Sequence, residues 1–130
     1  MNNLCPCGLE KSYTECCGYY HSRKGIPPTA EILMRSRYCA FVLKKEKYLL
    51  QTWHKSKRPK TLDLNLQNIK WMGLKILQIE AGTEKDIAGK VEFIAEFKAG
   101  NKVSSLHEKS NFIKEASRWL YVDGEMISNF

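Results

Sequence analysis

The chain has 130 residues and a formal net charge of +7, and 43% of its residues are hydrophobic and 27% charged. This length fits one domain with a small appendage, and the composition is that of an ordinary globular protein. No apolar run approaches the roughly 20 residues that cross a bilayer, so we expect no membrane span and a cytoplasmic location.

Four of the five cysteines lie within thirteen residues near the start of the chain; they are Cys5, Cys7, Cys16 and Cys17. Four thiolates this close together satisfy one tetrahedral Zn²⁺ in a closed, structural site. Pro6 fixes the backbone between the first two ligands, and Gly8 gives the freedom that a tight knuckle needs. Cys16 and Cys17 are adjacent, so we expect both to reach the metal from a helix turn or an irregular end.

Two alternatives to this ligand set stay open. His21 lies four residues beyond Cys17, and its imidazole could replace a thiolate in a Cys₃His site, which structural zinc also accepts. Two disulfides in a secreted miniprotein are the other alternative. Because the chain begins Met-Asn-Asn-Leu, with no basic and apolar signal segment, the zinc site is the interpretation that we adopt.

The segment after the cysteines predicts a linker and two helices. Residues 25–28 read Gly-Ile-Pro-Pro, a stiff linker that ends just before a helix start. Residues 29–44 predict the first helix and residues 46–54 the second, and Pro59 ends the helical pattern. Residues 1–25 are too short to bury a core, so metal must supply their folding free energy, and residues 26–130 form the main domain.

The first helix carries an arginine on its apolar stripe. Arg37 falls in a row with Leu33 and Phe41, spaced by four, so it points inward and needs a partner. Arg35 lies about 200° away around the helix and is placed for a surface ion pair with Glu31.

Positive charge is concentrated between residues 44 and 60. This segment, which we call the basic segment, holds seven Lys and Arg residues against one acidic residue, Glu46. Such a cluster attracts phosphate or acidic protein surfaces. The alternative is a solvated helix end that keeps the protein soluble, and no aromatic residue interleaves with its lysines at 55–60 to stack on bases.

From about residue 70 the pattern becomes that of strands. Residues 91–97 alternate apolar and charged side chains, which predicts a strand with one buried face. Residues 71–80 are apolar on both faces and predict a covered strand. Two more strands are expected at 103–114 and 118–123, with turns at 99–102 and at Asp123-Gly124. Two helices followed by a four-stranded antiparallel meander make an α+β fold.

A second group of polar residues is expected inside this fold. Glu108 alternates with Leu106, Ser110 and Phe112 on one strand face, so we expect it to pair with Arg37 between helix and sheet, near Trp53. Such a pair either fixes how the helix docks or forms the polar base of a ligand pocket. The weak catalytic candidates are Glu108 and His54, which could act as a general acid or base. Alternatively, His54 only stabilises the C-terminus of the second helix through the helix dipole. Cys39 is expected to be a core residue.

The N-terminal segment resembles the SEC-C motif, the zinc-binding tail that also ends the translocase SecA. The motif runs Cys-x-Cys, a Gly-Ser-Gly-Lys turn, then Cys paired with Cys or His. Here the turn is Gly8-Leu9-Glu10-Lys11, which keeps the Gly and the Lys and departs at the two middle residues. The tail of SecA binds the chaperone SecB and the ribosome, so the resemblance implies that a partner of this kind is conceivable.

The rest of the chain resembles the YchJ family, on TAEILMRSRYCAF at residues 29–41, TWH at 52–54 and LHEKSNF at 106–112. The resemblance implies an N-terminal SEC-C motif followed by a nuclear-transport-factor-2-like (NTF2-like) cone, in which helices pack on a curved antiparallel sheet. Two functions remain. The first is an interaction protein that contacts an acidic partner through the zinc module and the basic segment. The second is a small-molecule enzyme or binding protein, isomerase- or dehydratase-like, that uses the cone pocket.

Overall fold

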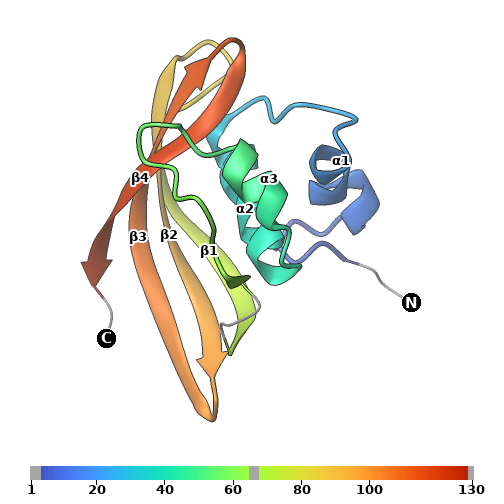
Figure 1. Cartoon of the computed structure of the whole chain (residues 1–130), viewed down its shortest axis with the longest axis vertical. Helices are drawn as coiled ribbons and strands as arrows, with labels where there is room; N and C mark the ends of the chain where they lie inside the picture. Colours follow the sequence, from blue (N-terminus) through green and yellow to red (C-terminus); the bar gives the residue numbers. More distant parts are fainter. Residues whose placement is uncertain (1–3, 65–67, 129–130) are drawn as a thin grey trace.

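The computed structural model describes residues 4–64 and 68–128, so the ends of the two expected domains, at 1–3 and 129–130, and residues 65–67 lie outside the described residues. A curved sheet forms one layer, two helices pack on it, and the N-terminal segment lies on the far side of those helices (Figure 1). In chain order the elements are a 3₁₀ turn at Tyr13–Glu15, α1 Cys17–His21, α2 Ala30–Val42, α3 Glu46–Gln51, β1 Ile69–Ala81, β2 Ala88–Ala99, β3 Lys102–Glu115 and β4 Arg118–Ser128.

The two helices begin where the sequence predicts. The side chain of Thr29 accepts a hydrogen bond from the backbone N–H of Ile32 at 3.1 Å and so caps the start of α2. The second helix, α3, ends at Gln51, earlier than the predicted residue 54. The chain leaves the helix there because it joins β4: the N–H of Tyr121 donates to Thr52 O at 2.8 Å, and the N–H of His54 donates to Tyr121 O at 2.7 Å.

The sheet is an antiparallel meander in the order β1-β2-β3-β4, as predicted. The turn between β2 and β3 lies at Gly100, whose φ of 63° favours glycine. The predicted turn at Asp123-Gly124 is wrong, because Gly124 pairs with Ser110 inside the β3–β4 ladder. This glycine serves close packing instead: a Cβ atom there would collide with the side chain of Glu108.

The expectation that β1 is covered on both faces is wrong. β1 is an edge strand, and Met72, Leu77 and Ile79 are exposed on it. Register shifts between Trp71 and Gly73, and again at Ile76, interrupt the alternation of its faces. The helices lie on one side of the sheet in Figure 1 and cover only part of its length, so apolar residues of this long strand remain exposed.

The two expected domains share one hydrophobic core. The buried cluster joins the N-terminal cysteines to Leu33, Met34 and Cys39 of α2 and to Val91 and Phe93 of β2. The helix α2 is therefore packed on one side by the sheet and on the other by the N-terminal module. The boundary at residue 25 stays a prediction. Among the described residues, no helix is long and apolar enough to span a membrane.

Candidate metal centre and ligand cavity

The four N-terminal cysteines converge on one point. The sulfurs of Cys5, Cys7, Cys16 and Cys17 all lie within 4.8 Å of one another, and all four side chains are buried. The Cys7 and Cys16 sulfurs are 3.6 Å apart. Zn–S bonds of about 2.3 Å in a tetrahedron put the sulfurs about 3.8 Å apart, so this arrangement fits one tetrahedral metal ion. None of the five cysteines forms a disulfide.

The local backbone explains this convergence. Gly8 has a φ of 94°, and its N–H donates to Cys5 O at 3.3 Å, which closes the tight knuckle after the second cysteine. Cys17 opens α1 and Cys16 is the residue just before it, so the adjacent pair reaches the same point from an irregular helix start. Both features agree with the sequence analysis.

The thiols influence one another strongly. Hydrogen bonds from Cys17 and Cys39 lower the pKa of Cys5 to about 6, and hydrogen bonds from the same two thiols lower the pKa of Cys7. Burial, followed by the hydrogen bond to Cys7, raises the pKa of Cys16 to about 12. Neutral thiols thus stabilise thiolates within the cluster. All four can ionise together only beside a cation, and the all-sulfur donor set is the one that zinc or iron–sulfur centres prefer.

His21, the alternative ligand, is engaged elsewhere. Its Nδ1 lies 2.6 Å from the hydroxyl of Tyr13, and its Nε2 lies 2.7 Å from the carbonyl oxygen of Ser36 in α2. Burial lowers the pKa of this imidazole, so it is neutral at pH 7. With both ring nitrogens occupied, His21 fastens the N-terminal module to α2.

Arg35 makes a second link between the module and α2. It forms the predicted ion pair with Glu31 at 2.9 Å, and its Nη1 also donates to Cys7 O at 2.7 Å. The carbonyl at the knuckle is therefore held by a charged donor from the helix.

A cavity of about 310 Å³ lies between α2 and the sheet. It is walled by aromatic and aliphatic side chains with a few polar groups, and its lining residues are Met34, Arg37, Tyr38, Phe41, Trp53, Trp71, Phe93, Ala95, Leu106, Glu108, Ser110 and Tyr121. This volume is at the lower end of the roughly 300–1,000 Å³ of small-molecule sites. The structure therefore brings together Arg37, Trp53, Glu108 and Ser110, the four pocket residues predicted from the sequence.

Arg37 points inward, as its position on α2 predicts, and is only 4% exposed. Its Nη1 donates to Leu49 O at 2.8 Å and to the Thr52 hydroxyl at 2.7 Å. Its guanidinium carbon lies 5.0 Å from the ring centroid of Trp53 and 4.6 Å from that of Tyr121. Burial lowers the pKa of Arg37 to about 10, so it remains a cation at neutral pH.

The expected ion pair between Arg37 and Glu108 is wrong: no such pair occurs in residues 4–64 and 68–128. Tyr121 links them instead, because its ring faces Arg37 and its hydroxyl donates to Glu108 Oε2 at 3.1 Å. The hydroxyl of Ser110 donates to the same oxygen at 2.7 Å. Burial, followed by the charge of Glu108, raises the pKa of Tyr121 and keeps it a donor.

Trp53 carries an unused hydrogen-bond donor. Its ring lines the cavity, and its Nε1 is buried with no acceptor among the described residues. A buried polar group without a partner costs about 1–3 kcal/mol, so such a group calls for an explanation.

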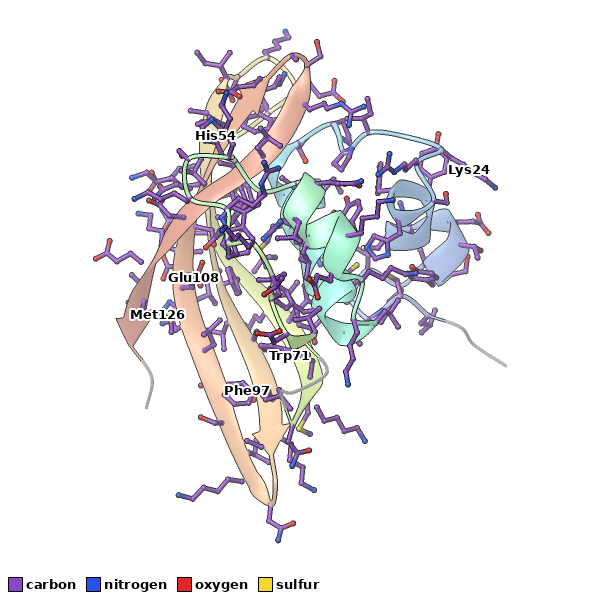
Figure 2. The ribbon with its side chains drawn as sticks, viewed as in Figure 1. Lys24, His54, Trp71, Phe97, Glu108 and Met126 are labelled. Carbon is purple, nitrogen blue, oxygen red and sulfur yellow. The ribbon has the colours of Figure 1, made fainter. Side chains whose placement is uncertain are left out.

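His54 lies outside the cavity. Its Nε2 is 3.0 Å from a carboxylate oxygen of Glu115, and its Nδ1 is 2.7 Å from the hydroxyl of Ser56. Figure 2 places it at the upper end of the sheet, away from Glu108 and Trp71. A general acid or base role for His54 inside the cavity does not fit this position, and Glu108 is the only carboxylate among the residues that line the cavity.

Sequence reasoning missed two of the residues that organise the cavity. Tyr121 supplies both the stacking ring for Arg37 and the hydroxyl for Glu108. Tyr121 alternates with Trp119 along the strand predicted at residues 118–123, and this alternation was the signal that could have identified it. Thr52 accepts from Arg37, and nothing in its sequence context indicates this. The prediction for Cys39 is incomplete: it is fully buried, but its sulfur lies 3.3 Å from that of Cys5.

Comparisons with known proteins agree with these two features. The family model described as "YchJ, middle NTF2-like domain" matches residues 29–124, and the SEC-C motif matches residues 1–18. A UPF0225 protein of Bordetella pertussis is 46% identical over 125 residues, covering 94% of this chain and 92% of that protein. A UPF0225 protein of Streptomyces coelicolor is 46% identical over 123 residues, covering 95% of both.

Two solved structures share the fold. A SEC-C motif containing protein from Rhodopseudomonas palustris, known from its solution structure, has a TM-score of 0.84 at 34% identity and covers 98% of this chain and 100% of its own. A crystal structure of a SEC-C motif containing protein from Psychrobacter arcticus has a TM-score of 0.77 at 27% identity. The match covers 98% of this chain and 84% of that protein.

The four-cysteine knuckle and the curved sheet under two helices define a SEC-C motif protein with an NTF2-like α+β domain. Within that class, the chain belongs to the YchJ family, whose relatives carry the UPF0225 designation. The family and fold expected from the sequence are thus confirmed.

Proposed function

We propose that this protein binds a small organic molecule in the cavity between α2 and the sheet, and that a zinc ion holds its N-terminal module against α2. From the sequence alone, an interaction protein was the first of the two expected functions. The observation that reverses this order is the set of polar groups that the cavity brings together: the buried Arg37 guanidinium, the unpaired Trp53 Nε1 and the Glu108 carboxylate.

The polar wall suggests what the ligand carries. Arg37 uses Nη1 for protein acceptors, and no other nitrogen of its guanidinium has an acceptor within the described part of the chain. Trp53 adds a second free donor. A carboxylate on the ligand would accept from both donors and would compensate a buried cation that has no ion-pair partner among the described residues. Glu108 offers Oε1 to a hydroxyl or amino group, since Oε2 already accepts two hydrogen bonds.

The rest of the wall suggests the body of the ligand. The ring centroids of Phe41 and Trp71 are 6.2 Å apart, and those of Tyr38 and Trp71 are 6.0 Å apart. At these separations the rings pack against one another and form an aromatic wall, which a flat or branched apolar group can contact. We therefore propose an aromatic or branched-chain carboxylic acid as the ligand class.

A panel of aromatic carboxylates, such as benzoate, phenylacetate, salicylate and indole-3-acetate, tests the proposal against the methyl esters of the same acids. The acids should raise the melting temperature and perturb the NMR signal of the Trp53 indole N–H, and the esters should bind more weakly. Trp53→Phe keeps an aromatic ring and removes the donor, and should weaken binding about tenfold. Arg58→Met, an exposed change outside the cavity, should leave binding unchanged. Acids and esters that bind equally, or acids that leave the Trp53 signal unmoved, would contradict the proposal.

The basic segment supports a second candidate function, binding of an acidic partner such as a ribonucleoprotein or a chaperone surface. Its seven cationic side chains are all exposed, and none takes part in an ion pair of the described structure. Ribosome co-sedimentation tests it. Binding should weaken steeply with salt and should be lost in a variant with Lys55, Lys57 and Lys60 changed to Gln. Lys102→Gln, at the exposed β2–β3 turn at the opposite end of the sheet, serves as the control.

A further inference from the structure

A second, smaller cavity lies where the N-terminal module and the linker meet the end of α3 and the start of β4. It encloses about 100 Å³ and shares no lining residue with the cavity between α2 and the sheet. Two arginines line it, Arg23 and Arg118, and no acidic residue does, so we call it the arginine cavity. Its volume is well below the roughly 300 Å³ at which small-molecule sites begin, so it suits one polar group of a ligand.

Neither arginine of this cavity has an ion-pair partner among the described residues. Glu115 is the ladder partner of Arg118 in β3–β4, but a carboxylate oxygen of Glu115 lies 3.0 Å from His54 Nε2 and is engaged there. Two cations that line one small cavity repel each other, and an anion between them turns that repulsion into attraction. Both side chains are exposed, so an anion can reach them without any opening of the fold.

The backbone of Arg23 is strained for the sake of its side chain. After α1 the N–H of Arg23 donates to Tyr20 O at 3.1 Å, and the N–H of Lys24 donates to Tyr19 O at 3.2 Å, which is the pairing of a Schellman motif. The residue at this position adopts a left-handed conformation and is usually glycine, whereas here it is an arginine with a φ of 66°. A side chain kept where glycine would relieve strain indicates a functional demand on that side chain.

We propose that the arginine cavity binds the phosphate group of a small phosphate monoester. A phosphate monoester carries a charge of about −1.5 to −2 at pH 7, which matches two arginines, whereas a carboxylate would neutralise only one of them. The guanidinium fork also fits phosphate oxygens in pairs. Gln51 lines the cavity and adds an amide donor, and the half-exposed Ile26 offers an apolar surface for the first carbons of the ester.

The bound phosphate would join two parts of the fold. Arg23 belongs to the N-terminal module, and Arg118 belongs to the first residue of β4. An anion held by both arginines stabilises the docked arrangement of module and sheet, and this stabilisation grows with the concentration of the anion. The proposal does not depend on which molecule occupies the cavity between α2 and the sheet.

Methyl phosphate binding to the full chain tests the proposal, with the NMR signals of the arginine Nε–H groups as the readout. At physiological ionic strength and a pH above 7, methyl phosphate should bind saturably and shift the signals of Arg23 and Arg118. Methyl sulfate has the same shape and a single negative charge, so it should bind more weakly. Binding that does not saturate, or equal affinity for the two esters, would overturn the proposal.

Variants with matched controls show where the phosphate binds. Arg23→Met and Arg118→Met should each weaken methyl phosphate binding about fivefold or more. Lys24→Met and Arg58→Met remove the same charge from exposed side chains outside the arginine cavity, and they should leave the affinity nearly unchanged. Equal losses in the arginine variants and their controls would mean diffuse attraction to a basic protein, and the proposal would fail.

Arg23→Gly gives a test that a loss of folding cannot imitate. Glycine suits the left-handed conformation at this position, so the ligand-free variant should melt at least as high as the parent protein. The same variant should lose methyl phosphate binding, and the melting temperature should no longer rise when the ester is added. An Arg23→Gly protein that binds the ester as tightly as the parent would contradict the role of Arg23.

Discussion

The side chain of Glu108 occupies the space into which a Cβ atom at position 124 would project, so Gly124 is what allows that carboxylate to enter the cavity wall from the neighbouring strand. The two hydrogen bonds that hold the carboxylate, from Ser110 and Tyr121, depend on this space. The glycine is therefore part of the cavity although it does not line it.

Gly124→Ala should destabilise the protein by about 1–3 kcal/mol, because Glu108 must turn away and leave its two donors without an acceptor. Gly73→Ala is the matched control: it also lies in a strand, and an added Cβ there has nothing within 4 Å. The control should stay within about 0.5 kcal/mol of the parent in urea unfolding. Equal effects of the two changes would show that the contact with Glu108 carries no energy.

Arg37→Lys should cost about 1–2 kcal/mol although the charge is retained, because an ammonium group cannot stack as a plane between Trp53 and Tyr121. Arg58→Lys, at an exposed position of the basic segment, is the control and should have no measurable effect. Thermal unfolding of the two variants checks this. A fully stable Arg37→Lys protein would mean that only the charge matters at this position.

Metal removal tests whether the two expected domains are independent. If they are, a strong chelator should disorder the N-terminal module and spare the main thermal transition. The shared core predicts a different result, because chelation frees the thiols that cover one side of α2. We expect one equivalent of zinc in protein purified without added metal, and a clear fall in the melting temperature of the whole chain when it is removed. An unchanged melting temperature would support independent domains.

Stability should fall between pH 10 and pH 12. Burial raises the pKa of Tyr38 and of Tyr48 from 10.0 to about 12. The folded state keeps these protons over a range in which the unfolded chain has lost them. Their stabilising contribution is therefore complete below pH 10 and is lost as the pH rises toward 12. Absorbance at the tyrosinate band should rise together with the loss of near-ultraviolet circular dichroism. Ionisation of these tyrosines near pH 10 in a folded protein would contradict this prediction.

Local patterns predicted the parts of the site that lie on one element. The apolar stripe through Leu33 and Arg37 predicted that the arginine points inward, as it does. Alternation in β3 predicted that Glu108 and Ser110 share one face, and both line the cavity. Arg37 and Glu108 are linked through Tyr121. The position of Tyr121 follows a register shift between Asn111 and Phe112 in the β3–β4 ladder. No local pattern encodes such a shift, so the ion pair was predicted where a tyrosine intervenes.

The same limit explains Cys39. Its neighbours on α2 are apolar, which identifies a buried position and nothing more. The cysteine cluster that it joins is more than twenty residues earlier in the chain, and it arrives there only because His21 and Arg35 dock the module on that face of the helix. The spacing of the first four cysteines predicts a site by itself, whereas a fifth sulfur from another element requires the tertiary structure.

The pairing of residues 52–54 with β4 also has a consequence for self-association. β4 is the last strand of the sheet, and an open strand edge is a template for intermolecular pairing. Thr52 and His54 occupy both backbone groups of Tyr121, and a parallel bridge joins Trp53 to it. This short segment closes the middle of the edge. His54→Pro removes the donating N–H and should detach this segment. The strand edge would then be open, and the protein should become prone to edge-to-edge aggregation.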